Sequence, residues 1–323
     1  MTEIALKFLI ESALTHMNES LTQHSQSPAS LFQIRKPRLT LDKDVILTSL
    51  TRRKLDEAIG AMKFHTTIYH DWGFGAVDPM GRNMVLNLYG PPGTGKTLAA
   101  EALAGTLGRE FIHIGIAELE SKYVGDTAKN IAAAFEIART ESAVLFFDEA
   151  DTLLGARLSS VTQGIDNEIN AMRSTLLMEL ERFDGVTIFA TNFAKNYDHA
   201  FVSRIRYHIE FQLPDLDCRR QLWQRLLVPG VPLAEDRDNL IRRCAEESQG
   251  LSGREIRNVL RTAFPKALMS GDAEPKVLWE HLASAIQEVH VAKLNVGKHQ
   301  QHETQYGSEE SVKAGVKMLG LAN

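Results

Sequence analysis

Apolar residues along this chain follow two patterns. Short, mostly apolar runs, typical of strands buried on both faces of a sheet, occur at residues 84–89, 111–114, 143–147, 186–190 and, less clearly, 208–211. Between these runs, apolar residues recur at the three- and four-residue intervals of helices, over residues 96–107, 127–139 and 167–182. Strands that alternate with helices predict an α/β fold, in which a parallel sheet carries helices on both faces.

The pattern changes near Pro214, after which helical spacing alone continues. The helices expected there cover residues 216–227, 236–247, 253–269 and 277–291. We therefore expect a large α/β domain followed by a small all-helical lid domain. The predicted regions are an N-terminal helical and linker region at 1–60, the large domain at 61–213, the lid at 214–293 and a polar tail at 294–323.

The N-terminal region combines an amphipathic pattern at residues 2–21 with a polar linker and then a basic cluster at residues 35–54. Asp42 and Asp44 interrupt the cluster, so we interpret it as a solvated surface rather than a nucleic-acid contact. The formal net charge of −5 agrees with this interpretation, because it provides no overall attraction to nucleic acid or to an anionic membrane.

Localisation signals and cysteines add further constraints. The first residues lack the basic start and the small-residue cleavage site of a signal peptide, and no run reaches the roughly 18 apolar residues of a membrane span. The two cysteines, Cys218 and Cys244, are far apart and suggest neither a disulfide framework nor a zinc site. We expect a cytoplasmic protein without membrane contact.

Residues 90–97 match the P-loop pattern G-x-x-x-x-G-K-[ST] and lie between a predicted strand and a predicted helix, which is the context a P-loop requires. Its glycines let backbone N–H groups surround phosphate oxygens, and the helix start favours the same anion. Lys96 is expected to reach the β- and γ-phosphates of ATP, and Thr97 to bind Mg²⁺. The predicted nucleotide-binding residues are Gly90, Pro91, Pro92, Gly93, Thr94, Gly95, Lys96 and Thr97.

Polar residues also follow two other predicted strands. Asp148 and Glu149 end the most apolar run, and Asn192 follows the run at 186–190. Ligands bind beyond the carboxyl ends of strands in open α/β sheets, so these side chains are expected near the P-loop. Asp148 would hold Mg²⁺, Glu149 would activate the attacking water, and Asn192 would orient that water.

Together these segments, Gly-Pro-Pro-Gly-Thr-Gly-Lys-Thr, Phe-Phe-Asp-Glu-Ala-Asp and Ala-Thr-Asn, resemble the AAA branch of the AAA+ ATPases over about residues 70–290. The resemblance implies a Mg²⁺-dependent ATPase that works as a homo-hexameric ring. It also implies that Gly73, in segment 71–75, contacts the adenine. Segment 120–126 resembles the loop that grips polypeptide in the central channel, which would place Lys122, Tyr123 and Val124 against a protein substrate.

The same resemblance assigns three arginines. Arg204 is implied to be the arginine finger that reaches the nucleotide of the neighbouring subunit. Arg206 is a candidate second finger, but the run after Arg204 departs from the family pattern, so this role stays open. Arg254 lies in a segment similar to sensor 2 of the lid, where it would sense the γ-phosphate; the alternative is a solvated arginine behind a helix cap at Ser252.

The preferred function is therefore ATP-driven remodelling, unfolding or disassembly of a protein threaded through a ring. Arginine at position 254 is shared with remodellers of HORMA-domain proteins, which keeps such a substrate in view. The alternatives are a nucleic-acid-associated AAA+ motor or loader, since residues 148–151 spell the helicase box D-E-A-D, and a module that binds ATP but barely hydrolyses it. A helicase of that type needs a second RecA-like domain, for which too little chain follows Pro214.

Overall fold

The structure is a computed structural model that describes residues 32–78, 83–119, 126–155, 165–192, 197–271 and 273–295. The chain divides into two compact units. The larger unit comprises residues up to Val45 together with Ser49–Gln212, and the smaller unit comprises Ile46–Thr48 and the chain from Leu213 onward.

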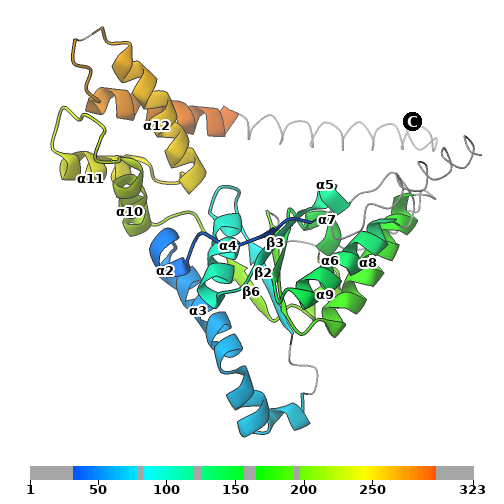
Figure 1. The fold of residues 1–323 in the computed structure, drawn as a ribbon. Coiled ribbons are helices and arrows are strands. Elements are labelled where there is room, and N and C mark those ends of the chain that lie inside the picture. The colour runs from blue at the N-terminus through cyan, green and yellow to red at the C-terminus, as the bar shows by residue number, and fades with distance from the viewer. Residues whose placement is uncertain are drawn as a thin grey trace, which may run out of the picture. The chain divides into compact units, whose positions relative to one another are not determined.

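Six strands of the larger unit form one sheet in the order β1-β3-β4-β5-β2-β6 (Figure 1). Five of them are mutually parallel, and the short strand β1 pairs antiparallel with β3 at one edge. The predicted α/β class is confirmed, with this antiparallel edge strand as an addition. The strands are β1 (Ile34–Arg35), β2 (Met84–Tyr89), β3 (Phe111–Gly115), β4 (Val144–Asp148), β5 (Val186–Thr191) and β6 (Tyr207–Glu210).

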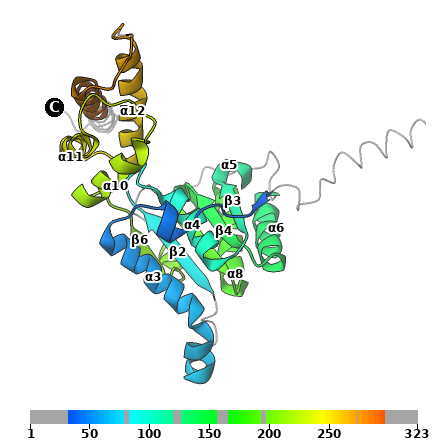
Figure 2. The same ribbon diagram turned by 60° about the vertical axis from the view of Figure 1, so that its left-hand side comes forward.

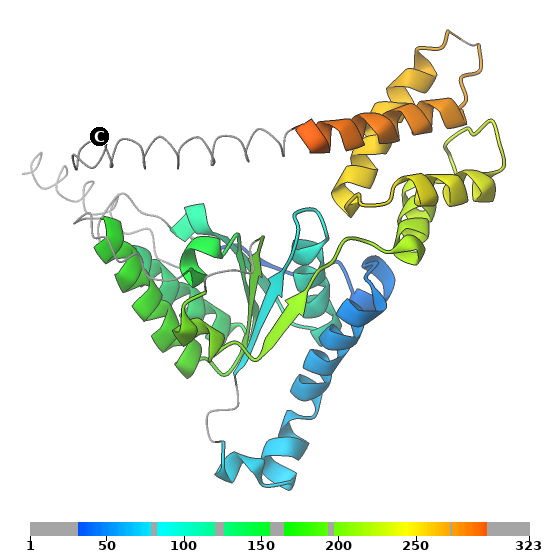
Figure 3. The ribbon, with the colours of Figure 1, turned by 180° about the vertical axis from the view of Figure 1, so that it is seen from behind.

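Helices cover both faces of this sheet. Figures 1 and 3 show α6 (Asp126–Thr140) and α8 (Ile165–Arg182) on one face, and α4 (Lys96–Leu107) with α3 (Ser49–Lys63) on the other. Shorter helices complete the layers: α2 (Leu41–Asp44), α5 (Ile116–Leu119), α7 (Asp151–Leu154) and α9 (His199–Val202). Among the described residues, no helix is both long and apolar enough to cross a membrane.

Consecutive phenylalanines in β4 show why this strand has no polar face. The ring of Phe147 lies 6.0 Å from that of Phe135 in α6, whereas the ring of Phe146 lies 5.7 Å from that of Phe111. Successive side chains of a strand point to opposite faces, so both faces of β4 are covered by apolar groups. This central strand thus delivers Asp148 from a rigid core to the carboxyl edge of the sheet.

Part of the region before residue 61 belongs to the same core. Leu41, Leu55 and Ala58 are buried, and the Thr51 hydroxyl donates to the Glu210 carbonyl over 2.8 Å. Helix α3 packs beside β6 and continues past the sheet into η2 (Thr67–Asp71) and η3 (Phe74–Ala76) (Figure 2). The large unit therefore begins before residue 61, because the apolar face of α3 covers the sheet edge.

The smaller unit is helical. It contains α10 (Leu216–Leu226), α11 (Arg237–Glu247), α12 (Gly253–Leu268) and a further helix at residues 279–295. Its core surrounds Trp223, which is fully buried and donates through Nε1 to the Ser248 hydroxyl at 2.9 Å. Cys218 and Cys244 are buried free thiols in this unit. The predicted starts of the first three helices agree with the structure to within one residue, whereas the fourth begins two residues later than predicted.

Candidate functional site

The P-loop joins the end of β2 to the start of α4. Gly90, Gly93 and Gly95 have φ values of 140°, 79° and 99°, which L side chains rarely adopt. A Cβ atom on Gly90 would lie 2.2 Å from the Phe211 carbonyl oxygen, so no larger residue fits there. The glycines thus turn the backbone sharply into the first turn of α4, where unpaired N–H groups and the helix dipole favour an anion.

Lys96 and Asn192 meet at this loop. The Lys96 ammonium group donates to the Gly90 carbonyl at 2.7 Å, to the Pro91 carbonyl at 3.0 Å and to Asn192 Oδ1 at 3.0 Å. Its side chain is largely buried. Because β5 pairs directly with β2, the residue that follows β5 reaches the loop that follows β2. The predicted neighbourhood of these two residues is therefore realised, although they are 96 positions apart.

Asp148 lies beside the P-loop as well. Its Oδ2 accepts from the Thr97 hydroxyl at 2.9 Å, and its Oδ1 accepts from the backbone N–H of Glu149 at 3.0 Å. Burial would raise the pKa of this carboxyl, but hydrogen bonds from His113, Thr97 and Glu149 more than offset burial, so the pKa is lowered. Asp148 is thus held as a carboxylate beside a hydroxyl.

His113 is a member of this site that the sequence analysis missed. Its Nε2 lies 3.5 Å from Asp148 Oδ2, because β3 runs parallel to β4 in a register that pairs Gly115 with Asp148. Imidazole in the middle of an apolar strand is the signal that could have drawn notice to it. The register that brings the ring to Asp148 cannot be derived from the local sequence.

The oxygen pair at Thr97 and Asp148 fits a magnesium ion. Mg²⁺ prefers hard oxygen ligands and takes only one or two from the protein, with phosphate and water completing its shell. The Thr97 hydroxyl and the Asp148 carboxylate, whose oxygens lie 2.9 Å apart beside the P-loop, match this requirement. When bound, the ion would neutralise phosphate charge.

Glu149 follows Asp148 with a backbone φ of 55° and an exposed side chain. Left-handed backbone is unfavourable for a non-glycine residue by about 1–2 kcal/mol, and such strain is concentrated at functional sites. The backbone here is anchored on both sides, since the next residue, Ala150, donates to the Ala190 carbonyl at 2.9 Å. The strained turn directs the Glu149 carboxylate away from the core and towards solvent.

The two candidate finger arginines have different neighbours. Arg204 donates through Nε to Glu181 Oε1 at 3.0 Å and through one terminal nitrogen to the Ala200 carbonyl at 2.8 Å. Arg206 donates to the Tyr69 hydroxyl at 2.7 Å and lies over the Tyr69 ring. Arg204 is thus held at α8 and α9, whereas Arg206 fastens η2 to the start of β6. Glu181 and Tyr69 were not singled out in the sequence.

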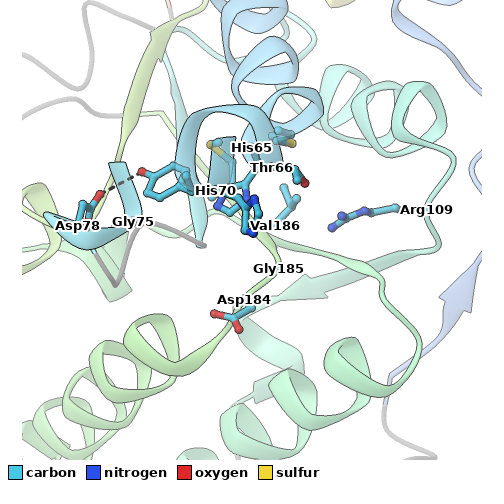
Figure 4. Close-up of a pocket in the computed structure, with 12 residues that line it drawn as sticks. His65, Thr66, His70, Gly75, Asp78, Arg109, Asp184, Gly185 and Val186 are labelled. Atoms are coloured by element: carbon cyan, nitrogen blue, oxygen red, sulfur yellow. Dashed lines mark hydrogen bonds between the residues drawn. The ribbon is translucent and has the colours of Figure 1, made fainter. Parts of the chain in front are cut away.

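The expected adenine contact of Gly73 does not agree with the structure. Gly73 joins η2 to η3, which line a pocket of about 640 Å³ together with Met84 and Val186, the first residues of β2 and β5 (Figure 4). The P-loop follows the last residue of β2, six residues or about 20 Å further along the strand. Gly73 therefore lies at the end of the sheet opposite the phosphate loop, because α3 carries this segment past the sheet.

The remaining predicted residues differ in what the structure says of them. Arg254 is the second residue of α12 and is exposed, behind the Ser252 cap. Lys122, Tyr123 and Val124 lie outside the described residues, so the channel loop stays a prediction from sequence.

A family model for the "ATPase family associated with various cellular activities (AAA)" matches residues 86–213. Residues 86–213 form an AAA domain. The match runs from the third residue of β2 to the end of the larger unit and contains every strand-end residue of the site described above. The resemblance inferred from the three segments is confirmed.

Several curated proteins are similar to about half of this chain. A 26S proteasome regulatory subunit 7 homolog from Schizosaccharomyces pombe is 38% identical over 183 residues, which are 54% of this chain and 41% of that protein. A katanin p60 ATPase-containing subunit A1 from Strongylocentrotus purpuratus is 35% identical over 56% of this chain and 36% of that protein. The chain thus spans less than half the length of these relatives.

Solved structures agree on the fold. The FIGL-1 AAA domain in complex with ADP superimposes with a TM-score of 0.67 over 82% of this chain and 90% of that chain, at 24% sequence identity. At this identity the likeness concerns the fold alone.

Proposed function

We propose that this chain hydrolyses ATP in a Mg²⁺-dependent reaction at the P-loop. The observation that carries the proposal is the convergence of Lys96, Thr97, Asp148 and Asn192 at one edge of the sheet. Lys96 binds the β- and γ-phosphates, and Thr97 and Asp148 hold the metal ion. Glu149 accepts a proton from the attacking water, which Asn192 orients.

The working form in this proposal is a homo-hexameric ring. Arg204 is held by Glu181 and Ala200, at the ends of α8 and α9 rather than at its own P-loop. A guanidinium in that place acts on the nucleotide of a neighbouring subunit, where its planar fork stabilises the charge of the transferring phosphate. The site is therefore complete only when a second copy contributes its arginine.

The proposed substrate is a protein that the ring pulls through its channel. Tyr123, flanked by Lys122 and Val124, supplies an aromatic grip that does not depend on substrate sequence. Relatives named as proteasome regulatory subunits and a katanin subunit support a protein rather than a nucleic acid as the substrate. The helical unit serves as the lid.

The finer proposal is a HORMA-domain substrate, and it rests on Arg254. A cation in the first turn of a helix opposes the helix dipole, so this arginine is poorly explained by the stability of α12. A role as the lid sensor of the γ-phosphate explains it, and the remodellers of HORMA-domain proteins share an arginine there.

The test measures the ATPase rate of the purified chain alone and with each of three additions: an unfolded protein, a folded HORMA-domain protein and double-stranded DNA. The proposal expects stimulation by protein and no response to DNA. Stimulation by DNA alone would favour a nucleic-acid motor instead. No ATPase activity under any condition would contradict the proposal as a whole, and the Glu149→Gln variant serves as the inactive control.

A further inference from the structure

Four polar side chains form a cluster inside the larger unit, which we call the buried polar cluster: Asn87, Thr191, Tyr197 and His208. Asn87 is fully buried in the middle of β2, where the neighbouring positions are apolar. Its Nδ2 lies 3.2 Å from the Tyr197 hydroxyl and 3.4 Å from His208 Nδ1. The Tyr197 hydroxyl in turn lies 2.6 Å from Thr191 Oγ1. The cluster therefore spans β2, β5, β6 and the chain before α9.

The direction of these hydrogen bonds follows from the donor groups. The Asn87 amide nitrogen can only donate, so the Tyr197 oxygen accepts from it, and either hydroxyl can be the donor between Tyr197 and Thr191. Burial lowers the pKa of His208, and a hydrogen bond with the Val202 backbone offsets only part of this effect. A neutral imidazole can accept at Nδ1, as its contact with Asn87 requires.

The cluster does not serve stability well. Among the described residues, Asn87 Oδ1 is buried without any hydrogen-bond partner. Buried polar groups that stay unpaired destabilise a fold, and a partly satisfied network is less favourable than apolar residues in its place. Apolar side chains in this part of the sheet would therefore give a more stable fold. This indicates that the cluster has a role other than stability.

Its members stand next to the residues of the proposed reaction. Asn87 lies three residues before Gly90, and Thr191 directly precedes Asn192. Tyr197 directly precedes Asp198, which caps α9 by accepting from the Ala200 N–H at 2.9 Å. Helix α9 then leads to Arg204. The Tyr197 hydroxyl thus joins the strand end that bears Asn192 to the short segment that carries the finger.

We propose that Tyr197 is a positioning residue that ties Arg204 to the Asn192 end of β5 through its hydrogen bond with Thr191. This inference rests on the proposed function. Strand β5 would then have two tasks. It carries Asn192 to the subunit's own nucleotide site, and through Tyr197 it positions the arginine finger that enters the neighbour's site. The hydroxyl, rather than the ring, carries this role, because the ring only packs at the edge of the apolar core.

The test uses rings of two kinds of subunit, so that Tyr197 is altered only where a finger is donated. Acceptor subunits carry Arg204→Ala and keep their P-loop. Donor subunits carry Lys96→Ala, cannot hydrolyse ATP and keep their finger. Tyr197→Phe is then added to the donor alone, with Tyr207→Phe in the donor as the matched control. Tyr207 is a half-buried tyrosine on β6 outside the cluster.

Tyr197→Phe in the donor should lower the ATPase rate of mixed rings by roughly 2- to 30-fold, the range that residues of a coupling network span. Thr191→Val in the donor should do the same, because it removes the other end of the same hydrogen bond. Tyr207→Phe should leave the rate unchanged. Native mass spectrometry of the mixed rings checks that each donor folds and assembles.

Two results would overturn the inference alone. One is an unchanged rate with the Tyr197→Phe donor, and the other is a loss with Tyr197→Phe that Thr191→Val does not share, since the tie to β5 would then be absent. Mixed rings that show no activity even with intact Tyr197 would instead contradict the trans-acting finger, and with it the proposed ring. If Tyr197→Phe donors fail to fold, the Thr191→Val donor decides.

Discussion

Glu149 and Lys96 illustrate how single residues divide the proposed work. Lys96 donates to two P-loop carbonyls and to Asn192, and its proposed task is the binding of phosphate. Glu149 follows Asp148, the carboxylate proposed to hold Mg²⁺, on a strained turn and is exposed to solvent. The proposal thus assigns binding to a side chain at the start of α4 and chemistry to a side chain that follows β4.

Substitution at these two residues should separate binding from turnover. Glu149→Gln keeps the shape of the side chain but removes the base, so ATP binding should persist while turnover falls by about 10²–10⁴-fold. Lys96→Ala removes the ammonium group that is proposed to bind the phosphates, and it should abolish ATP binding. Nucleotide titration and steady-state ATPase assays measure both effects. Wild-type turnover by Glu149→Gln would refute its assignment as the base.

At the scale of whole elements, helix α12 shows how hydrogen bonds at its N-terminus stabilise the helical unit. The Ser252 side chain accepts from the Glu255 N–H, and the Glu255 carboxylate accepts from the Ser252 N–H, which is a complete capping box. Lys293 adds an ion pair to Glu255 at 3.1 Å. These contacts join the start of α12 to the last described helix of the same unit.

Ser252→Ala should destabilise the helical unit by about 1 kcal/mol, whereas Ser252→Gly should cost only a few tenths. The measurement is denaturant unfolding of the full chain, followed by fluorescence of Trp223 and Trp279 in a Trp72→Phe background. Equal stability of Ser252→Ala and the parent would show that the cap contributes nothing.

Glu255 makes the same element sensitive to acid. Burial would raise the pKa of this carboxyl, but its hydrogen bonds from Ser252 and Lys293 outweigh burial and lower it below 4.5. Its stabilising effect is therefore complete above pH 4.5 and is lost as the pH falls through the folded-state pKa. In the fluorescence experiment, Glu255→Gln should reduce the loss of stability that occurs as the pH falls below 4.5.

The proposed output depends on residues 120–126, which the sequence predicts to be the channel loop. Tyr123→Ala should leave basal ATPase activity within a few-fold, because the residues assigned to hydrolysis remain intact. Remodelling of a protein substrate should fail, and Tyr123→Phe should keep it, because the aromatic surface rather than the hydroxyl grips the chain. Unfolding and ATPase rates measured side by side test this. Loss of ATPase activity and assembly in Tyr123→Ala would instead indicate a packing role.

The whole molecule in this proposal is a ring of identical subunits, which mixing experiments can address. Arg204→Ala alone should lose on the order of 10³-fold or more in ATPase rate, because the transition state loses its trans-acting cation. Adding Lys96→Ala subunits should restore part of the activity, since each mixed interface pairs an intact P-loop with an intact finger. Well-sustained hydrolysis by an Arg204→Ala monomer would contradict the trans-acting finger.

Local sequence alone determined the central strands of the sheet and the phosphate loop of this protein. The strand at 84–89 was predicted with its observed bounds, and the runs at 111–114, 143–147 and 186–190 were off by one residue at their ends. Such runs report burial on both faces of a strand, and the P-loop glycines report backbone angles. Both properties depend on neighbours within a few residues, so they can be derived from the sequence.

Only the tertiary structure decided which distant residues meet. The strand order places β5 against β2, which brings Asn192 to Lys96, and the register of β3 on β4 brings His113 to Asp148. The path of α3 carried Gly73 to the far end of the sheet, and Glu181 came to face Arg204. Strand order and register are set by contacts summed over the whole core, and no local pattern contains that sum.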